Sequence, residues 1–294
     1  MPFTEHLAFA RRYARATVAA RRLDAERCIL PAPHRPEPSA WPDDRLTVSW
    51  LGHATVLLNL YGTWVVTDPV LERRIGLGRG FVKVGPRRLV APALRKRELP
   101  PLDVVLLSHA HMDHTDLGTL CAIPPKVRVV VQSGNRDLVR RFHAVDELAW
   151  GETARIGDLE VESVETRHWG ARMITDRHRS WGGYLLRKAG RTVLFGGDTA
   201  YTDGFTRFRD RGPIDLAILP IGAYDPWATS HASPEEAWRM FKALGAEYLL
   251  PIHHSTFRLS REPVDEPLRR LLAAAGAERW RVVITEVGQT WSPT

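Results

Sequence analysis

Imidazole and carboxylate side chains crowd into one short run of this sequence, His109-Ala110-His111-Met112-Asp113-His114. Zinc and similar divalent cations accept both kinds of ligand, at about 2.0–2.2 Å. The run follows an apolar segment, residues 103–108, that predicts a strand, and a turn after a strand can aim several side chains at one point. His109 and His111 can then converge on one cation while Asp113 and His114 face a second. The spacing predicts a site for two metal ions, and a polar turn with fortuitous histidines is the weaker interpretation.

Three further candidate ligands each follow a segment that predicts a strand. His168 comes after residues 159–165, Asp198 after residues 192–196 and His253 after residues 248–252. The glycines beside Asp198 let the backbone approach closely, as expected where one carboxylate must bridge two cations. Each residue alone fits a polar turn, but together with the six-residue run they form a ligand set.

The elements that must position these ligands are short strands separated by turn residues. The runs that predict strands are residues 46–50, 55–60, 64–67, 104–108, 127–132, 159–165, 192–196, 216–220 and 248–252. Helices are predicted over residues 135–141, 234–244 and 264–275. Early hairpins followed by strand–helix alternation indicate an α/β (α+β) fold.

Residues 1–45 are predicted to precede or pack on a core domain of residues 46–294. Residues 5–27 predict a helix, and the proline-rich residues 31–45 predict a connector. The pair Arg11-Arg12 invites a secretion signal, but the interrupted apolar stretch after it favours a retained helix. Such a helix packs against the main body of a protein more often than it lies on an anionic membrane, and the sequence is compatible with both interpretations.

The composition is that of an ordinary globular protein, with 294 residues, 44% hydrophobic and 26% charged. No apolar run approaches the roughly 20 residues that span a bilayer. The two cysteines, Cys28 and Cys121, form no C-x-x-C motif, which argues against a disulfide framework and a thiolate zinc site. A reducing cytoplasm is the expected location.

The formal net charge of +7 favours anionic partners such as phosphate esters, acidic lipid surfaces or nucleic acid. The arginines are scattered through the chain, so a generally basic surface explains the charge equally well. An anionic small molecule or a phospholipid is the expected substrate, with peripheral contact to an anionic membrane left open. Nucleic acid is disfavoured because no appended binding module is visible.

The positions of the candidate ligands and the short sequence motifs around them resemble those of the metallo-β-lactamase superfamily. Over residues 46–260 the chain is similar to the branch that contains N-acyl-phosphatidylethanolamine-hydrolysing phospholipase D. The strings that carry this similarity are Trp50-Leu51-Gly52-His53-Ala54-Thr55, Thr67-Asp68-Pro69, His168-Trp169, Gly197-Asp198-Thr199-Ala200-Tyr201, Gly222-Ala223-Tyr224 and Ile252-His253-His254-Ser255-Thr256-Phe257. The resemblance implies a four-layer αβ/βα sandwich, two mixed β-sheets flanked by helices, with a dinuclear site at their shared edge.

The resemblance also implies a role for each ligand. His109, His111 and His168 would hold the first metal, Asp113, His114 and His253 the second, and Asp198 would bridge them. Of the adjacent histidines 253 and 254, alternation along an extended segment sends only one imidazole toward the metals. The family pattern selects His253, which leaves His254 as a neighbour.

Three more residues are candidates for supporting roles. A carboxylate that accepts a ring N–H fixes the tautomer of a ligand histidine, and Asp68, between a strand and Pro69, is the candidate. His53 is assigned to the site, to the substrate or to a structural role. His231 precedes a helix start, and the resemblance implies that it acts near the reacting group. The remaining histidines are expected on the surface or in loops: His6, His34, His143 and His178.

The predicted function is a dinuclear metal-dependent hydrolase, in the first place a phosphodiesterase that resembles phospholipase D. Two divalent cations about 3.5–4 Å apart lower the pKa of a shared water, and the hydroxide attacks phosphorus in line with the leaving oxygen. Asp113 could orient this nucleophile while His231 stabilises the developing charge. Zinc is the expected metal, although iron and manganese accept the same ligands.

Several alternatives stay open for this sequence. A lactonase or sugar-phosphate lactonase could use the same site, because hydroxide also attacks a carbonyl carbon. A nuclease and a non-catalytic metal-binding protein rank lower, and an oxygen-reducing diiron protein is disfavoured by the histidine at position 111. Four tryptophans could either line an apolar entrance to the site or fill the core: Trp41, Trp169, Trp181 and Trp227. A homodimer is compatible with the sequence.

Overall fold

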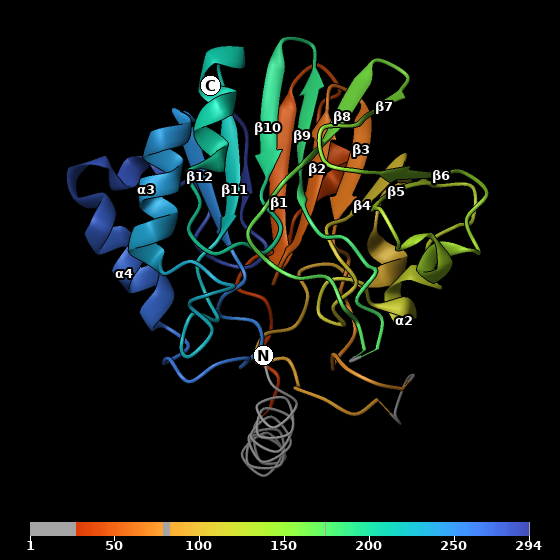
Figure 1. Ribbon diagram of the computed structural model, residues 1–294, viewed down its shortest axis with the longest axis horizontal. Helices are drawn as coiled ribbons and strands as arrows, with labels where there is room; N and C mark the ends of the chain where they lie inside the picture. Colours follow the sequence, from red (N-terminus) through yellow and green to blue (C-terminus); the bar gives the residue numbers. More distant parts are fainter. Residues whose placement is uncertain (1–27, 79–82, 174, 294) are drawn as a thin grey trace.

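Two mixed β-sheets face each other in this computed structural model, which describes residues 28–78, 83–173 and 175–293 (Figure 1). The first sheet has the order β13-β1-β2-β3-β4-β5-β6 and the second the order β12-β11-β10-β9-β8-β7. Strands of the first sheet are β1 (Leu46–Gly52), β2 (Thr55–Leu60), β3 (Thr63–Thr67), β4 (Val104–Leu107), β5 (Arg128–Gln132), β6 (Val145–Leu148) and β13 (Thr290–Trp291). Strands of the second are β7 (Thr153–Ile156), β8 (Leu159–Val164), β9 (Gly183–Lys188), β10 (Arg191–Phe195), β11 (Leu216–Pro220) and β12 (Tyr248–Ile252).

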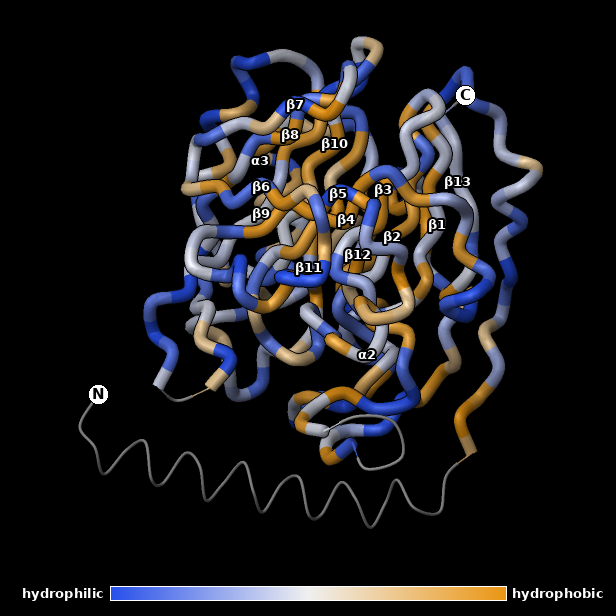
Figure 2. Tube along the Cα trace, turned by 90° about the vertical axis from the view of Figure 1, so that its right-hand side faces the viewer, coloured by the Kyte–Doolittle hydropathy of each residue, from blue (hydrophilic) through white to orange (hydrophobic). Residues whose placement is uncertain are grey.

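Alternation along the strands produces two apolar layers. In β9 and β10, Leu186 and Val193 pack into the cluster between the sheets. Leu185 and Leu194 point the opposite way, into a second cluster beneath the helices. In Figure 2 the apolar residues are accordingly concentrated in the strands, while the outer loops are more polar. The fold is thus the layered sandwich that the sequence resemblance implied.

Two helices, α3 (Pro234–Leu244) and α4 (Glu266–Ala275), cover the outer face of the second sheet, and a short helix, α2 (Leu117–Leu120), follows β4 (Figure 1). Ser233 caps α3 by accepting from the backbone N–H of Glu236, whose side chain in turn bonds to the Ser233 N–H. This capping box fixes where the helix begins. The 3-10 segments are Pro38–Ala40, Lys96–Glu98, Arg136–Val139, Gly204–Arg211 and Gly276–Arg281.

Parallel neighbours bring the loops of the site to one edge. Strands β3, β4 and β5 are parallel in the first sheet, and β10, β11 and β12 are parallel in the second. Strand β8 runs the same way as β10, because each is antiparallel to β9. Segments that follow these strands therefore leave both sheets at a common edge, the lower one in Figure 1.

The helix predicted over residues 135–141 is wrong, since only the 3-10 turn Arg136–Val139 forms there. The Asn135 side chain donates to the carbonyls of Gln132 and Ser180, 2.9 Å each, which ties the segment down before a full helix can begin. Strands β6, β7, β9 and β13 were not predicted. The helix predicted over residues 5–27 lies outside the described residues, and among those that are described no helix is long and apolar enough to cross a bilayer.

Candidate metal centre

Three imidazoles meet at the end of β4. The Nδ1 atom of His111 lies 2.7 Å from Nε2 of His109 and 3.3 Å from Nε2 of His168. A single proton can satisfy only one such pair of nitrogens, whereas a cation accepts all three lone pairs. Of these residues, His109 and His111 follow β4 of the first sheet, and His168 follows β8 of the second.

A second group combines a carboxylate with imidazoles. Asp113 Oδ2 lies 3.1 Å from Nε2 of His53, 3.5 Å from Nε2 of His253 and 3.6 Å from Nε2 of His114. These four ligand atoms lie within 4.8 Å of one another. Asp113 is 18% exposed, while the three imidazoles are almost fully buried, so the carboxylate marks the solvent side of the group.

Asp198, at the end of β10, faces both groups with the same atom. Its Oδ2 atom lies 3.1 Å from Nε2 of His114 and 3.2 Å from Nε2 of His253. Toward the first group, the distances are 3.8 Å to Nε2 of His168 and 4.0 Å to Nε2 of His109. This is the position of a carboxylate that can bridge two cations.

The donor set fits divalent cations. Oδ1 of Asp198 is buried and has no hydrogen-bond partner among the described residues. Nε2 of His114 and Nε2 of His253 are also buried and, although close to Asp198 Oδ2, form no hydrogen bond with it. A buried polar group without a partner costs about 1–3 kcal/mol, more if it is charged. A metal ion bound between these atoms would remove that cost. The clusters are therefore suited to a dinuclear metal site.

Hydrogen bonds on the far side of the rings select the tautomer that a metal needs. Nδ1 of His109 lies 2.9 Å from Ser108 Oγ, and Nδ1 of His168 lies 2.8 Å from the Ser230 carbonyl. Nδ1 of His114 donates to Asp68 Oδ2 at 2.6 Å. When Nδ1 carries the proton, the lone pair of Nε2 points into the site. Asp68, the candidate for this task, follows β3 beside β4.

Sequence reasoning missed the supporting residues Ser108, Ser230 and Arg172. Ser108 donates its backbone N–H to Asp68 Oδ1 at 2.7 Å and its hydroxyl to Oδ2 at 2.5 Å. Arg172 Nη1 donates to the carbonyls of Ala110 and Thr115, 2.8 Å each, and so holds the ligand loop. The sequence did offer one signal for Ser108, because its hydroxyl stands directly before the first histidine of the run. The contacts of Ser230 and Arg172 involve backbone carbonyls, which carry no sequence signature.

Burial and neighbouring charges set the protonation of the cluster. Burial, followed by the nearby His114 and His111, holds the pKa of His109 well below its usual value. Burial opposes ionisation of Asp113 and Asp198, but the surrounding imidazoles, His114 first, hold the pKa of both carboxyls well below the usual range. Neutral imidazole and ionised carboxylate are the forms that bind metal.

The pKa of His114 is shifted in the opposite direction to that of His109. Burial disfavours its protonated form, yet the carboxylates of Asp198, Asp113 and Asp68 raise its pKa well above the usual value. The ring therefore lies in a strongly negative environment. The same environment favours a divalent cation beside Nε2.

Unusual backbone geometry supports the site. His53, Asp68 and His253 have φ values of 56°, 34° and 63°, in the left-handed region that non-glycine residues rarely adopt. Gly197 has φ +56°, and a Cβ there would lie 2.7 Å from the Cβ of Ser108. Only glycine lets the loop with Asp198 lie this close to the end of β4, which confirms the close approach predicted beside Asp198.

The remaining predicted residues fall into different environments. Nε2 of His231 lies 3.3 Å from Asp198 Oδ2, with 13% of the side chain exposed. His53 belongs to the second group and is almost fully buried, and burial lowers its pKa to about 3. His254 points away from both groups and stacks on Trp50, with ring centroids 4.6 Å apart. It is a buried neighbour that belongs to neither ligand group, and its Nδ1 lies 2.9 Å from Ser255 Oγ.

The other histidines and the tryptophans differ in their exposure and in their distance from the site. His34, His143 and His178 are exposed, as predicted, and His6 lies outside the described residues. Trp169 is 45% exposed and packs edge-on against His111, with centroids 4.2 Å apart. It therefore belongs to the surroundings of the site, whereas Trp41 stacks on Trp64 at 5.4 Å.

Comparison with known sequences gives consistent relatives. A family described as the beta-lactamase superfamily domain matches residues 63–254. An uncharacterized protein of Mycobacterium tuberculosis is 38% identical over 279 residues, covering 89% of this chain and 74% of that protein. N-acyl-phosphatidylethanolamine-hydrolyzing phospholipase D 1 of Caenorhabditis elegans is 31% identical over 271 residues, covering 84% of this chain and 75% of that protein.

Solved structures show the same fold at low sequence identity. An isothiocyanate hydrolase from gut bacteria of Delia radicum matches with a TM-score of 0.67 at 18% identity, over 84% of this chain and 100% of that one. A metallo hydrolase of the archaeon Ignicoccus hospitalis matches with a TM-score of 0.62 at 19% identity, over 85% and 98%. At these identities the likeness establishes the architecture alone.

Proposed function

The chain belongs to the metallo-β-lactamase superfamily, and from this premise we propose that it is a dinuclear metal-dependent hydrolase that cleaves phosphodiesters. The observation that carries the proposal is the placement of Asp198 Oδ2, 3.1–4.0 Å from imidazole nitrogens of both ligand groups. A carboxylate placed between two nitrogen-rich groups could bridge two metal ions held by those groups.

One cation would be held by His109, His111 and His168. The other would be held by Asp113, His114 and His253, and Asp198 would contact both cations. When bound, two divalent cations, zinc in the first place, supply Lewis acidity and make water nucleophilic near neutral pH. Asp113 is the most exposed of the carboxylates in the cluster, and His53 steadies it from the buried side at 3.1 Å. Asp113 is thus placed to accept a hydrogen bond from the attacking water and to orient it.

His231 is proposed to act on the substrate. Its ring lies on the loop before α3, with Nε2 3.3 Å from Asp198 Oδ2 and part of the side chain open to solvent. An N–H at this position can donate to a phosphoryl oxygen while water attacks phosphorus and the bond to the leaving alcohol oxygen breaks. In this role His231 stabilises charge that develops in the transition state and does not need to hold metal.

Phosphodiesters of the N-acyl-phosphatidylethanolamine type are the proposed substrates. The support is the phospholipase D of C. elegans, which aligns over 84% of this chain at 31% identity, together with the formal net charge of +7 that favours anionic substrates. A lactone is the alternative substrate, because the same site can act on a carbonyl carbon.

The decisive experiment measures hydrolysis by protein whose metal content has been quantified. The panel contains an N-acyl-phosphatidylethanolamine, a soluble aryl phosphodiester and an acyl lactone, each assayed with the wild-type chain and with His231→Ala. We expect phosphodiester cleavage with about two metals bound, and a loss of about 10²-fold or more in kcat for His231→Ala with metal retained.

Each result of this panel supports or contradicts a specific part of the proposal. Turnover of the lactone without any phosphodiester would replace the proposed reaction with lactone hydrolysis. A normal rate in metal-loaded His231→Ala would remove His231 from the mechanism. His143→Ala, which changes an exposed histidine away from the site, is the matched control and should keep full activity.

A further inference from the structure

A large open cavity, about 840 Å³, lies outside the ligand groups. Its walls come from three segments, residues 28–30, 87–90 and 255–265. The first two are joined by a bridge between Leu30 and Val90. None of the residues in the two metal-ligand groups lines it.

Part of the cavity wall is apolar. Leu30, Leu89, Val90 and Val264 line it, and Leu30 keeps 60% of its surface exposed. These four side chains present apolar atoms to a concave surface, and ligand sites are lined mostly by apolar groups. This part of the cavity suits an aliphatic chain.

The rest of the wall is basic. Arg88 is buried, 2% exposed, and its guanidinium donates to backbone carbonyls, among them Glu72 O at 2.9 Å. Arg258 and Arg261 also line the cavity, and neither side chain has a hydrogen bond or ion pair within the described ranges. Asp265 is the single acidic residue among the described residues that line the cavity. Arg258 is half-buried and Arg261 is exposed, and a guanidinium without a partner at a concave surface favours an oxyanion.

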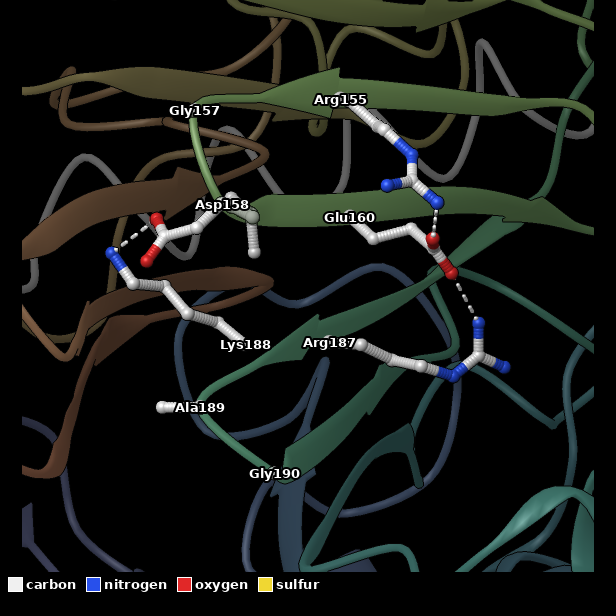
Figure 3. A pocket seen from close by; sticks show the side chains of 9 residues that line it. Arg155, Gly157, Asp158, Glu160, Arg187, Lys188, Ala189 and Gly190 are labelled. Atoms are coloured by element: carbon white, nitrogen blue, oxygen red, sulfur yellow. Dashed lines mark hydrogen bonds and ion pairs between the residues drawn. The ribbon is translucent and has the colours of Figure 1, made fainter.

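A smaller hollow at the far ends of β7 to β10 shows the contrast (Figure 3). There Arg155 and Arg187 both bind Glu160, at 3.0 and 2.9 Å, and Lys188 binds Asp158 at 2.8 Å. The hollow has cations of its own, but carboxylates of the chain already neutralise them. The larger cavity lacks such carboxylate partners for Arg258 and Arg261 among the residues described.

We infer that the larger cavity binds an amphiphilic oxyanion, a carboxylate or phosphate head group carried on an aliphatic chain. The head group would bind Arg258 and Arg261, and the chain would lie against Leu30, Val90 and Val264. This site is separate from the proposed metal centre, and the inference does not depend on the proposed reaction.

The two cysteines provide a direct test. Both are exposed, but only Cys28 lines the cavity, while Cys121 follows α2. Alkylation of each thiol can be followed by mass spectrometry in the same molecule, with Cys121 as internal control. We expect octyl phosphate and octanoate, below their micelle concentrations, to slow alkylation of Cys28 at least tenfold and to leave Cys121 unchanged.

Comparison ligands separate the contributions of head group and chain. Octyl glucoside has the chain without the charge, and inorganic phosphate has the charge without the chain. Both should protect Cys28 at least tenfold less well than octyl phosphate at equal concentration. Equal protection by octyl glucoside would contradict the oxyanion site, and equal protection by inorganic phosphate would contradict the role of the chain.

Variants assign the binding to the arginines. Arg258→Gln should raise the half-protecting concentration of octyl phosphate about tenfold or more, because a charge-assisted hydrogen bond is lost. Arg258→Lys should lie in between, and Arg155→Gln, in the neutralised hollow, should match the wild type. If Arg258→Gln fails to fold, Arg261→Gln, an exposed position, takes its place. Unchanged protection in a folded variant, or equal slowing at both cysteines, would overturn the inference.

Discussion

Asp198 is the residue on which both ligand groups converge. Replacing it with alanine removes the carboxylate whose Oδ2 lies within 4.0 Å of His109, His114, His168 and His253. We expect Asp198→Ala to lose bound metal and to lose activity by about 10²-fold or more. Elemental analysis of the purified variant, beside a rate measurement, checks both. Asp44→Ala, at an exposed carboxylate, is the control, and a fully metallated, active Asp198→Ala would refute the bridging role.

Ser108 tests how much the ligands depend on what orients them. Its hydroxyl lies between Asp68 and the His109 ring, 2.5 Å from Oδ2 and 2.9 Å from Nδ1. Ser108→Ala should weaken metal binding about 10–100-fold, the range typical of residues that orient metal ligands. Titration with a competing chelator measures this affinity directly. Ser108→Thr keeps the hydroxyl and should restore much of the affinity; no rescue would point to a packing effect instead.

At the same scale, the sequence predicted the reactive groups better than their supports. His168, Asp198 and His253 were recognisable because each stands where an apolar run ends, and the structure gathers them with the six-residue run. The bond from His168 to the Ser230 carbonyl could not be predicted, since it joins residues 62 positions apart through a backbone atom. Sequence patterns reveal side-chain types, whereas such contacts depend on how distant loops meet.

Gly197 shows how an element brings a ligand into place. Its backbone at φ +56° lies against both β4 and the loop before β9, and an added Cβ would come within 2.9 Å of the Gly182 carbonyl. We expect Gly197→Ala to lower the free energy of unfolding by about 1–3 kcal/mol, as overpacking does, and to reduce metal affinity because Asp198 shifts. Denaturant unfolding and metal titration check the two effects. Gly157→Ala, where φ is also positive but no atom lies within 4 Å, separates crowding from backbone strain.

Strand prediction succeeded for several strands that are buried on both faces, although β9, which is also largely buried, was missed. Strands β2, β11 and β12 have the bounds predicted from their apolar runs, and the helix α3 begins and ends as its capping residues indicated. The edge strand β7 was missed because Thr153 and Arg155 are exposed and interrupt the apolar pattern. Strand β13 is only two residues long, Thr290–Trp291, and pairs with β1, which no local signal reveals.

Viewed as a whole, the molecule draws its metal ligands from both sheets. His109, His111, Asp113 and His114 follow β4 in the first sheet, while His168, Asp198 and His253 follow strands of the second. The apolar cluster between the sheets holds these halves together without metal. Cations bound at their shared edge would add a second connection, made of coordinate bonds that the unfolded chain cannot form.

Removing metal should therefore lower the stability of the entire fold. Metal that binds only the folded chain stabilises it by RT ln(1 + [L]/Kd), roughly 4 kcal/mol at a free concentration a thousand times Kd. For a protein of this size such a change corresponds to about 10 °C in Tm. We expect chelation to lower Tm by about that amount and added zinc to restore it, measured by calorimetry at fixed protein concentration. Asp198→Ala should show little metal-dependent shift, and an unchanged Tm after verified metal removal from the wild type would contradict coupling between the site and the two sheets.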